Sequence, residues 1–196
     1  TISGRIASRS RSIQRARSCK RSAGERQARS ARRVVRAFGL IEGKRVANAL
    51  VVVSHPDPCS FNLALAKALH ESFQKAGLSS HLCDLHRMGF DPVITTPEAR
   101  GTPATDPLVI GQIALLREAT ILAVVHPNCW GAPPAMMKGW MDRVFAHGAA
   151  YAFPKSRDAG EAPFGMLTTK AALVLNTSNT AEERESTEFG DPLDRI

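Results

Sequence analysis

The sequence predicts an α/β protein built on an open parallel sheet. Apolar, β-branched runs alternate with stretches whose apolar residues recur at the period of a helix. This alternation favours parallel strands joined by right-handed helical crossovers. Three predicted strands end in polar loops, at residues 54–62, 126–133 and 176–180. Because ligands of open parallel sheets bind at the carboxyl ends of the strands, we expect these loops to form one site.

The basic charge of the chain is confined to its first segment. The net charge is +8, yet residues 1–37 hold eleven arginines and one lysine against the single acid Glu25. This segment is rich in serine and poor in large apolar residues, so a disordered basic leader is expected over residues 1–42. An appended leader and an organellar transit peptide both fit this composition. A nucleic-acid-binding arm fits least, because no stacking aromatic precedes Phe38.

Residues 43–196 are expected to form one folded domain. No stretch approaches the roughly 20 apolar residues that span a bilayer. The cysteines, at positions 19, 59, 83 and 129, lack C-x-x-C spacing, so neither a metal site nor a redox dithiol is predicted. A cytoplasmic location follows from this cysteine usage, with organellar import as the alternative if the leader is a native transit peptide.

The first predicted strand, at about 46–54, passes through a proline-rich turn directly into a helix. The helix is expected from Phe61 to about Ala76, and Gly77 suits its C-terminus. A second strand is predicted at Ser79–Leu85. The predicted apolar stripe of the helix consists of Phe61, Ala64, Leu65, Ala68, Leu69 and Phe73.

The second half of the domain repeats the pattern after loop-like residues 86–106. Asp106-Pro107 supplies an N-cap and a first-turn proline for a helix that reaches about Glu118. A third strand at Ala119–Val125, a helix opened by Pro134, a loop at 147–169 and a fourth strand at Ala171–Leu175 follow. In the Pro134 helix the predicted packing residues are Met137, Trp140, Met141, Val144 and Phe145, and the predicted solvent-facing residues are Lys138, Asp142 and Arg143.

The first loop suits a phosphate group. A strand that feeds a helix through a tight turn directs backbone N–H groups at one point, and a helix N-terminus favours an anion. His55, Ser60 and Asn62 add polar side chains there, beside Phe61. The competing interpretation is structural, with Ser60 capping the helix and His55 making a local hydrogen bond. Cys59 also lies near His55, but no acyl-transfer motif surrounds this pair.

The second loop offers an aromatic wall. Trp130 suits the side of a flat ring system, although it equally suits packing on the helix that follows. The chain contains neither G-x-G-x-x-G nor G-x-x-x-x-G-K-[ST]. The sequence therefore indicates neither a dinucleotide fingerprint nor a P-loop.

Three segments together resemble one family. Residues 54–62, Ser-His-Pro-Asp-Pro-Cys-Ser-Phe-Asn, are similar to the H-P-x-x-x-S-F-N segment of the flavodoxin-like NAD(P)H:quinone oxidoreductases. Residues 84–93 resemble the D-L-Y-x-M-x-F-D-P-V stretch of that family. Residues 127–144 resemble its P-x-W-W-x-x-P-A-I-L-K-G-W-x-D-R-V signature, and the likeness covers about residues 45–192.

The resemblance implies a three-layer α/β/α flavodoxin-like fold, bound FAD or FMN, and hydride transfer from NAD(P)H to a quinone or related acceptor. It also implies a homodimer and no metal. The flavin carries the hydride chemistry, so no acid–base pair is required and no catalytic side chain is assigned. The implied flavin-binding residues are His55, Ser60, Phe61, Asn62, Pro127, Asn128, Cys129, Trp130, Gly131, Thr177, Ser178, Asn179 and Thr180.

The chain also departs from the family pattern. Cys129 stands where relatives often carry an aromatic residue, and no counterpart of their assisting Tyr and His follows Asn179. The family continues with a fifth strand and a closing helix, so we expect a sheet that lacks these elements and has the fourth strand at its edge. Two other functions remain open, an ancillary flavoprotein of a membrane ion-efflux system and, less favoured, a one-electron carrier.

Overall fold

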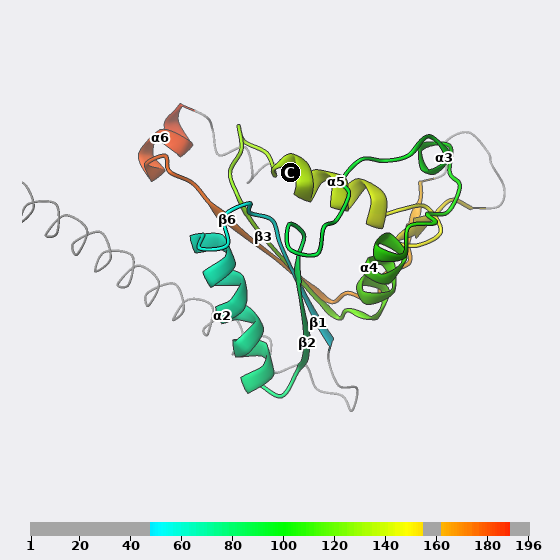
Figure 1. Cartoon of the computed structure of the whole chain (residues 1–196), viewed down its shortest axis with the longest axis horizontal. Helices are drawn as coiled ribbons and strands as arrows, with labels where there is room; N and C mark the ends of the chain where they lie inside the picture. The colour runs from blue at the N-terminus through cyan, green and yellow to red at the C-terminus, as the bar shows by residue number, and fades with distance from the viewer. Residues whose placement is uncertain (1–47, 155–161, 189–196) are drawn as a thin grey trace, which may run out of the picture.

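The computed structural model describes residues 48–154 and 162–188, which form an α/β fold around one parallel sheet (Figure 1). The strands are β1 (Asn48–Val53), β2 (Ser79–Asp84), β3 (Ile121–Pro127) and β6 (Ala171–Thr177). Their order is β2-β1-β3-β6, and every neighbouring pair is parallel. The predicted fold class is therefore confirmed, and the direction of strand order reverses between β1 and β3, where such sheets bind ligands. The expected leader lies outside the described residues.

Helices cover both faces of the sheet, which gives three layers. Figure 1 shows α2 on one face and α4 and α5 on the other. The remaining elements are short. Some of them lie in segments that were expected to be loops: α3 lies in residues 86–106, and β4 and β5 lie in residues 147–169. The bounds are α2 (Phe61–Lys75), α3 (Thr96–Ala99), α4 (Pro107–Glu118), α5 (Ala135–Val144), α6 (Glu182–Thr187), β4 (Tyr151–Ala152) and β5 (Phe164–Gly165).

The buried side of α2 is rotated slightly around the helix axis from the predicted apolar stripe. Leu65, Leu69 and Phe73 are buried as expected, against alternate residues of β1 and β3. Phe61 and Ala64 are exposed, whereas Leu63 and Ala66 are buried in their place. The sequence pattern alone fits either buried side, because alanine and leucine occur on both sides of the helix. Contact with the sheet decides which side is buried.

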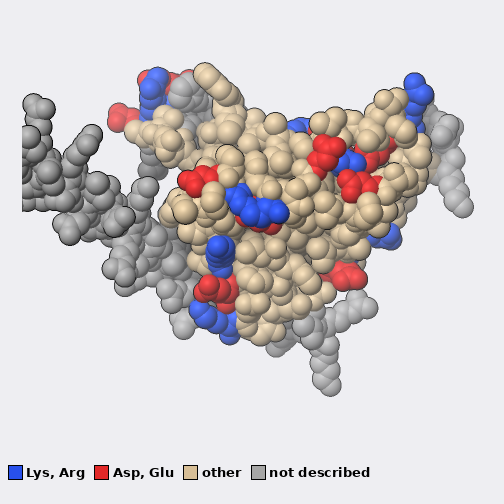
Figure 2. Space-filling view, viewed as in Figure 1, with Lys and Arg blue, Asp and Glu red and all other residues tan. Residues whose placement is uncertain are grey.

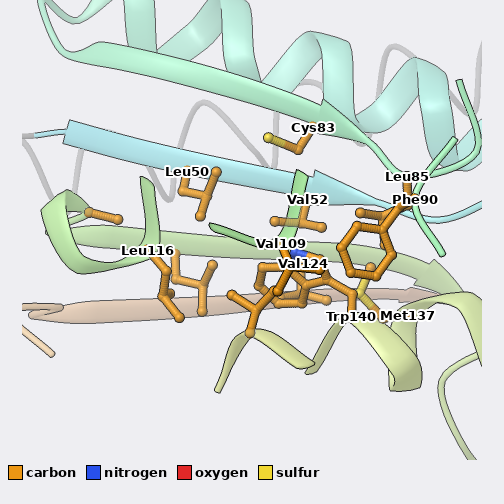
Figure 3. Close-up of a cluster of buried hydrophobic side chains, with 13 residues drawn as sticks. Leu50, Val52, Cys83, Leu85, Phe90, Val109, Leu116, Val124, Met137 and Trp140 are labelled. Carbon is orange, nitrogen blue, oxygen red and sulfur yellow. The ribbon is translucent and has the colours of Figure 1, made fainter. Parts of the chain in front are cut away.

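The opposite face packs α4 and α5 onto the sheet. Figure 3 shows Met137 and Trp140 of α5 beside Val124 and Val52 of the sheet, in one apolar cluster. The indole Nε1–H of the buried Trp140 donates to Gln112 Oε1 at 3.1 Å, so the ring contributes apolar area without an unsatisfied donor. The predicted packing face of this helix is confirmed.

The interpretation of Arg143 as a solvent-facing residue is wrong. Arg143 is 4% exposed. Its Nη2 lies 2.9 Å from Glu98 Oε1 and its Nη1 donates to the Asp91 carbonyl at 2.7 Å. A further oxygen, Asp106 Oδ2, lies 3.5 Å away. The segment 91–106 folds over this side of α5 and brings two carboxylates to the guanidinium, which helical periodicity cannot predict.

Several exclusions apply to the described part of the chain. No helix in it combines the length and apolar character required to cross a bilayer. Nor does it contain three His, Cys, Asp or Glu side chains grouped to hold a metal ion. Figure 2 shows basic and acidic side chains interspersed on the visible face, rather than gathered into a patch of one sign.

Candidate functional site

The first loop, residues 54–60, ends in an uncovered helix N-terminus. Ser60 is the N-cap of α2, and its Oγ accepts from the Leu63 N–H at 3.2 Å. The capping interpretation of Ser60 is therefore confirmed, and its hydroxyl proton is still available to donate. The N–H groups of Phe61 and Asn62 have no acceptor among the described residues. Two backbone donors and a hydroxyl at a helix N-terminus suit a phosphate group.

The interior of the first loop is held by Asp57. Its N–H donates to His55 Nδ1 at 3.1 Å, and its Oδ1 accepts from the Cys59 N–H at 2.8 Å. Because Nδ1 of His55 is the acceptor, Nε2 carries the proton in the neutral ring. The local hydrogen bond expected of His55 is present, and Nε2 remains as a donor.

The second loop is a tight two-residue turn. Cys129 and Ala132 exchange backbone hydrogen bonds of 2.9 and 3.1 Å. Between them, Trp130 and Gly131 have φ values of 58° and 75°. The Gly131 N–H donates to Asn128 Oδ1 at 2.7 Å, which fixes the turn from inside.

Trp130 is presented to solvent by this turn. Its side chain is fully exposed, so the alternative that it packs on the following helix is wrong. A non-glycine residue with positive φ is uncommon, and for a bulky residue it costs about 1–2 kcal/mol. The loop therefore keeps a large aromatic ring exposed in an unfavourable backbone conformation.

Thr177 connects the third loop to the other two. The Asn62 Nδ2 donates to Thr177 Oγ1 at 2.9 Å, and the Asn128 N–H donates to the Thr177 carbonyl at 2.7 Å. Thr177 is the last residue of β6, which extends two residues beyond the predicted strand. Ser178 Oγ accepts from the Thr180 N–H at 3.0 Å, and Asn179 is exposed.

A polar row lies just beneath the loops. His126 and Asn176 are partners in the β3–β6 register, and Ser54 follows the Val53–Val125 pair of β1 and β3. His126 Nδ1 is 2.9 Å from the Pro127 carbonyl and 3.3 Å from Asn176 Nδ2. Within the described residues, Ser54 Oγ is the buried side-chain N or O atom that has no hydrogen-bond partner.

Arg87 is a functional candidate that sequence reasoning missed. It follows β2 and donates from Nη1 to the His55 carbonyl and from Nη2 to the Pro56 carbonyl, each at 2.7 Å. The available signal was its place just after a strand, at the same edge as the three loops. Burial and the charge of Arg87 lower the pKa of neighbouring His86, and Asp84 opposes this effect.

The structure thus brings the predicted loops together at one edge. Ser60 and Asn62 lie at the start of α2, and His55 contacts Asp57 and Arg87 in the loop that leads to it. Asn128 and Asn62 both contact Thr177, and Trp130 is exposed to solvent. Pro127 ends β3 beside Thr177 in the register. Ser54, His126 and Asn176 lie within the predicted loops but were not among the predicted binding residues, and Arg87 lies outside those loops.

Comparison with known proteins agrees with this architecture. The family model described as "Flavodoxin-like fold" matches residues 47–196. The chain belongs to the flavodoxin-like fold family. The three-layer arrangement and the site at the carboxyl edge are those of a flavodoxin-like domain.

Two curated relatives are quinone dehydrogenases by name. Ribosyldihydronicotinamide dehydrogenase [quinone] of Mus musculus is 31% identical over 160 residues, 71% of this chain and 66% of that protein. NAD(P)H dehydrogenase [quinone] 1 of Cavia porcellus is 31% identical over 151 residues, 67% of this chain and 54% of that protein. The flavodoxin-like chain thus spans between about half and two thirds of the length of these relatives.

A solved structure shows the same fold. NAD(P)H:quinone oxidoreductase from Methanothermobacter marburgensis superposes with a TM-score of 0.61 at 24% identity. The match covers 76% of this chain and 80% of that one. At this identity the likeness supports the flavodoxin-like fold and does not define the ligand.

Proposed function

We propose that this protein is a flavin-dependent NAD(P)H oxidoreductase that reduces quinones or related electrophiles. The observation that carries the proposal is the junction at Thr177, which gathers a helix N-terminus with unpaired N–H groups and a loop with an exposed indole at one edge of the sheet. The names of the two relatives at 31% identity support the nicotinamide donor and the quinone acceptor.

The polar atoms of the first loop fit the phosphate part of a flavin cofactor. The free N–H groups of Phe61 and Asn62, with the Ser60 hydroxyl, would bind phosphate oxygens. His55 would add its Nε2–H. This donor set suits either the phosphate of FMN or the pyrophosphate of FAD, and the proposal includes both.

The second and third loops fit the ring part. Trp130 would lie along the flat ring system, and the turn formed by Asn128, Cys129 and Gly131 would approach it with backbone groups. Pro127 ends the strand beneath this turn. At the polar edge of the ring we place Thr177, Ser178, Asn179 and Thr180.

In the proposed reaction, the cofactor would carry out the hydride transfer. When bound, a flavin would supply the hydride chemistry between the nicotinamide and the acceptor, so the protein would need no acid–base pair of its own. The task of these side chains is to hold phosphate and ring and to supply hydrogen bonds where negative charge develops on reduction. We also propose a homodimer, which sedimentation of the purified protein tests.

The test is the absorbance spectrum of the purified chain, before and after titration with FMN and FAD. Visible flavin bands that bleach on anaerobic addition of NADH or NADPH, and return when a quinone is added, are the expected result. A protein that binds neither flavin contradicts the proposal. A protein that binds flavin without bleaching would instead favour an ancillary flavoprotein.

A further inference from the structure

The geometry points to Arg87 as the positioning residue of the first loop, and this inference rests on the proposed binding of flavin phosphate there. Arg87 lies outside that loop in sequence and comes from the segment after β2. Its guanidinium bridges two successive carbonyls of the loop, those of His55 and Pro56, at 2.7 Å each.

The two carbonyls depend on this bridge. Within the described part of the chain, the His55 and Pro56 oxygens accept hydrogen bonds from Arg87 alone. Asp84 Oδ1 lies 3.4 Å from the same Nη1 and accepts from the Arg87 N–H at 3.3 Å, which holds the side chain over the loop. A planar guanidinium offers two parallel donors, whereas a lysine ammonium offers a single point of charge.

The bridge matters because of the charge that the loop must accept. Carbonyl oxygens are the negative ends of backbone dipoles, and if they turned toward the start of α2 they would repel a phosphate. Arg87 holds two of them on its own side, so the N–H groups of Phe61 and Asn62 remain the polar groups at the helix N-terminus. Its positive charge adds to the favourable field of the helix dipole.

This role differs from simple stabilisation of the fold. The side chain of Arg87 is one-third exposed, and its ion pair with Asp84 is a partly solvated contact of small energy. A merely structural Arg87 would affect all flavins equally. A positioning role toward phosphate predicts that FMN is affected and riboflavin, which has the same ring and no phosphate, is not.

The experiment compares binding of FMN and riboflavin by wild-type protein, Arg87→Ala, Arg87→Lys and the control Arg117→Ala. Arg117 is an exposed arginine at the C-terminal end of α4. For Arg87→Ala we expect about tenfold weaker FMN binding, the effect of a lost charge-assisted hydrogen bond, with riboflavin binding unchanged. Arg87→Lys should recover only part of the FMN affinity, and the control should match wild type.

A second measurement does not depend on flavin. In the ligand-free protein, Arg87→Ala should speed hydrogen exchange of the Asp57 and Cys59 amides, while exchange in the core of β3 stays at its wild-type rate. Equal loss of FMN and riboflavin binding, full affinity in Arg87→Lys, or unchanged exchange in the loop overturns the inference. If wild type binds neither FMN nor FAD, the proposed function fails instead, and loop exchange still tests the positioning role.

Discussion

The side-chain amide of Asn62 at the start of α2 donates to the hydroxyl of Thr177 at the end of β6, at 2.9 Å and across 115 residues of sequence. The carbonyl of Thr177 accepts from the Asn128 N–H at 2.7 Å. One residue therefore joins three loops, and the geometry of the candidate site depends on it.

Thr177→Val should release Asn62 from the junction while keeping side-chain shape, and it leaves the backbone bond between Asn128 and residue 177 in place. Asn62 is buried, so loss of its partner leaves an unsatisfied amide and should lower the free energy of unfolding by about 1–3 kcal/mol. We expect weaker binding of FMN and FAD, measured by titration, and a lower urea midpoint. Thr168→Val removes an exposed hydroxyl bonded to the Arg117 carbonyl, away from the loops, and should change neither. Equal behaviour of the two variants would contradict the role of Thr177.

Trp130 allows stability and binding to be separated. Trp130→Gly removes an exposed ring and relieves the positive φ, so unfolding should become about 1–2 kcal/mol less favourable. Trp130→Ala removes the ring and keeps most of the backbone cost. Both variants should retain flavin less well than wild type after gel filtration. Full flavin occupancy in both would remove Trp130 from the site.

Glu98 should control acid stability. Burial alone would raise the pKa of Glu98, but hydrogen bonds from Arg143 and Thr95 outweigh burial and hold that pKa below its ordinary value. Because the folded-state pKa is the lower one, ionised Glu98 stabilises the fold above the unfolded-state pKa. This contribution is lost as pH falls through the folded-state pKa.

Glu98→Gln tests this sign. At neutral pH it should cost about 3 kcal/mol, because the buried Arg143 loses the nearer of its two charged partners and keeps only Asp106. The difference from wild type should shrink as the solution is acidified. Asp142→Asn, which removes the exposed partner of Lys138, is the control and should cost less than about 1 kcal/mol. Urea unfolding at several pH values measures both, and a constant difference for Glu98→Gln would refute the linkage.

Gly139 is required by close packing. A Cβ at this position would lie 2.2 Å from the Pro92 carbonyl oxygen, a backbone atom. Gly139→Ala should therefore destabilise the fold by about 1–3 kcal/mol through overpacking. Gly111 of α4 has nothing within 4 Å of such a Cβ, so Gly111→Ala should stabilise by about 0.5–1 kcal/mol. Thermal unfolding measures the change in stability of each variant, and a change of the same sign in both would contradict the packing argument.

Local patterns predicted most of the scaffold. Asp106-Pro107 begins α4 and Ser60 begins α2 as expected, because capping depends on neighbours within one turn. The capping box of Thr95 and Glu98 begins α3 within the segment 86–106 that is predicted to be a loop, and this signal too is local. Local signals of this kind need no knowledge of the fold.

Contacts between distant segments could not be predicted from local sequence patterns. Arg143 has the spacing of a surface residue, yet residues 91–106 bury it. Trp130 has a large apolar side chain of the kind that usually packs in a core, yet a two-residue turn exposes it. In both cases the environment is supplied by another part of the chain, and a periodic pattern records only which side of its own element a residue occupies.

The sequence by itself determined the alternation of strands and helices, the parallel sheet and the three polar loops, because these follow from apolar periodicity and turn chemistry along the chain. The tertiary structure alone decided that Thr177 joins the loops, that Arg87 bridges the first loop from the segment after β2, and that Ser54 carries an unpaired hydroxyl. Hydrogen bonds across the carboxyl edge require strands from distant parts of the chain to lie side by side, and strand order exists only in the folded sheet.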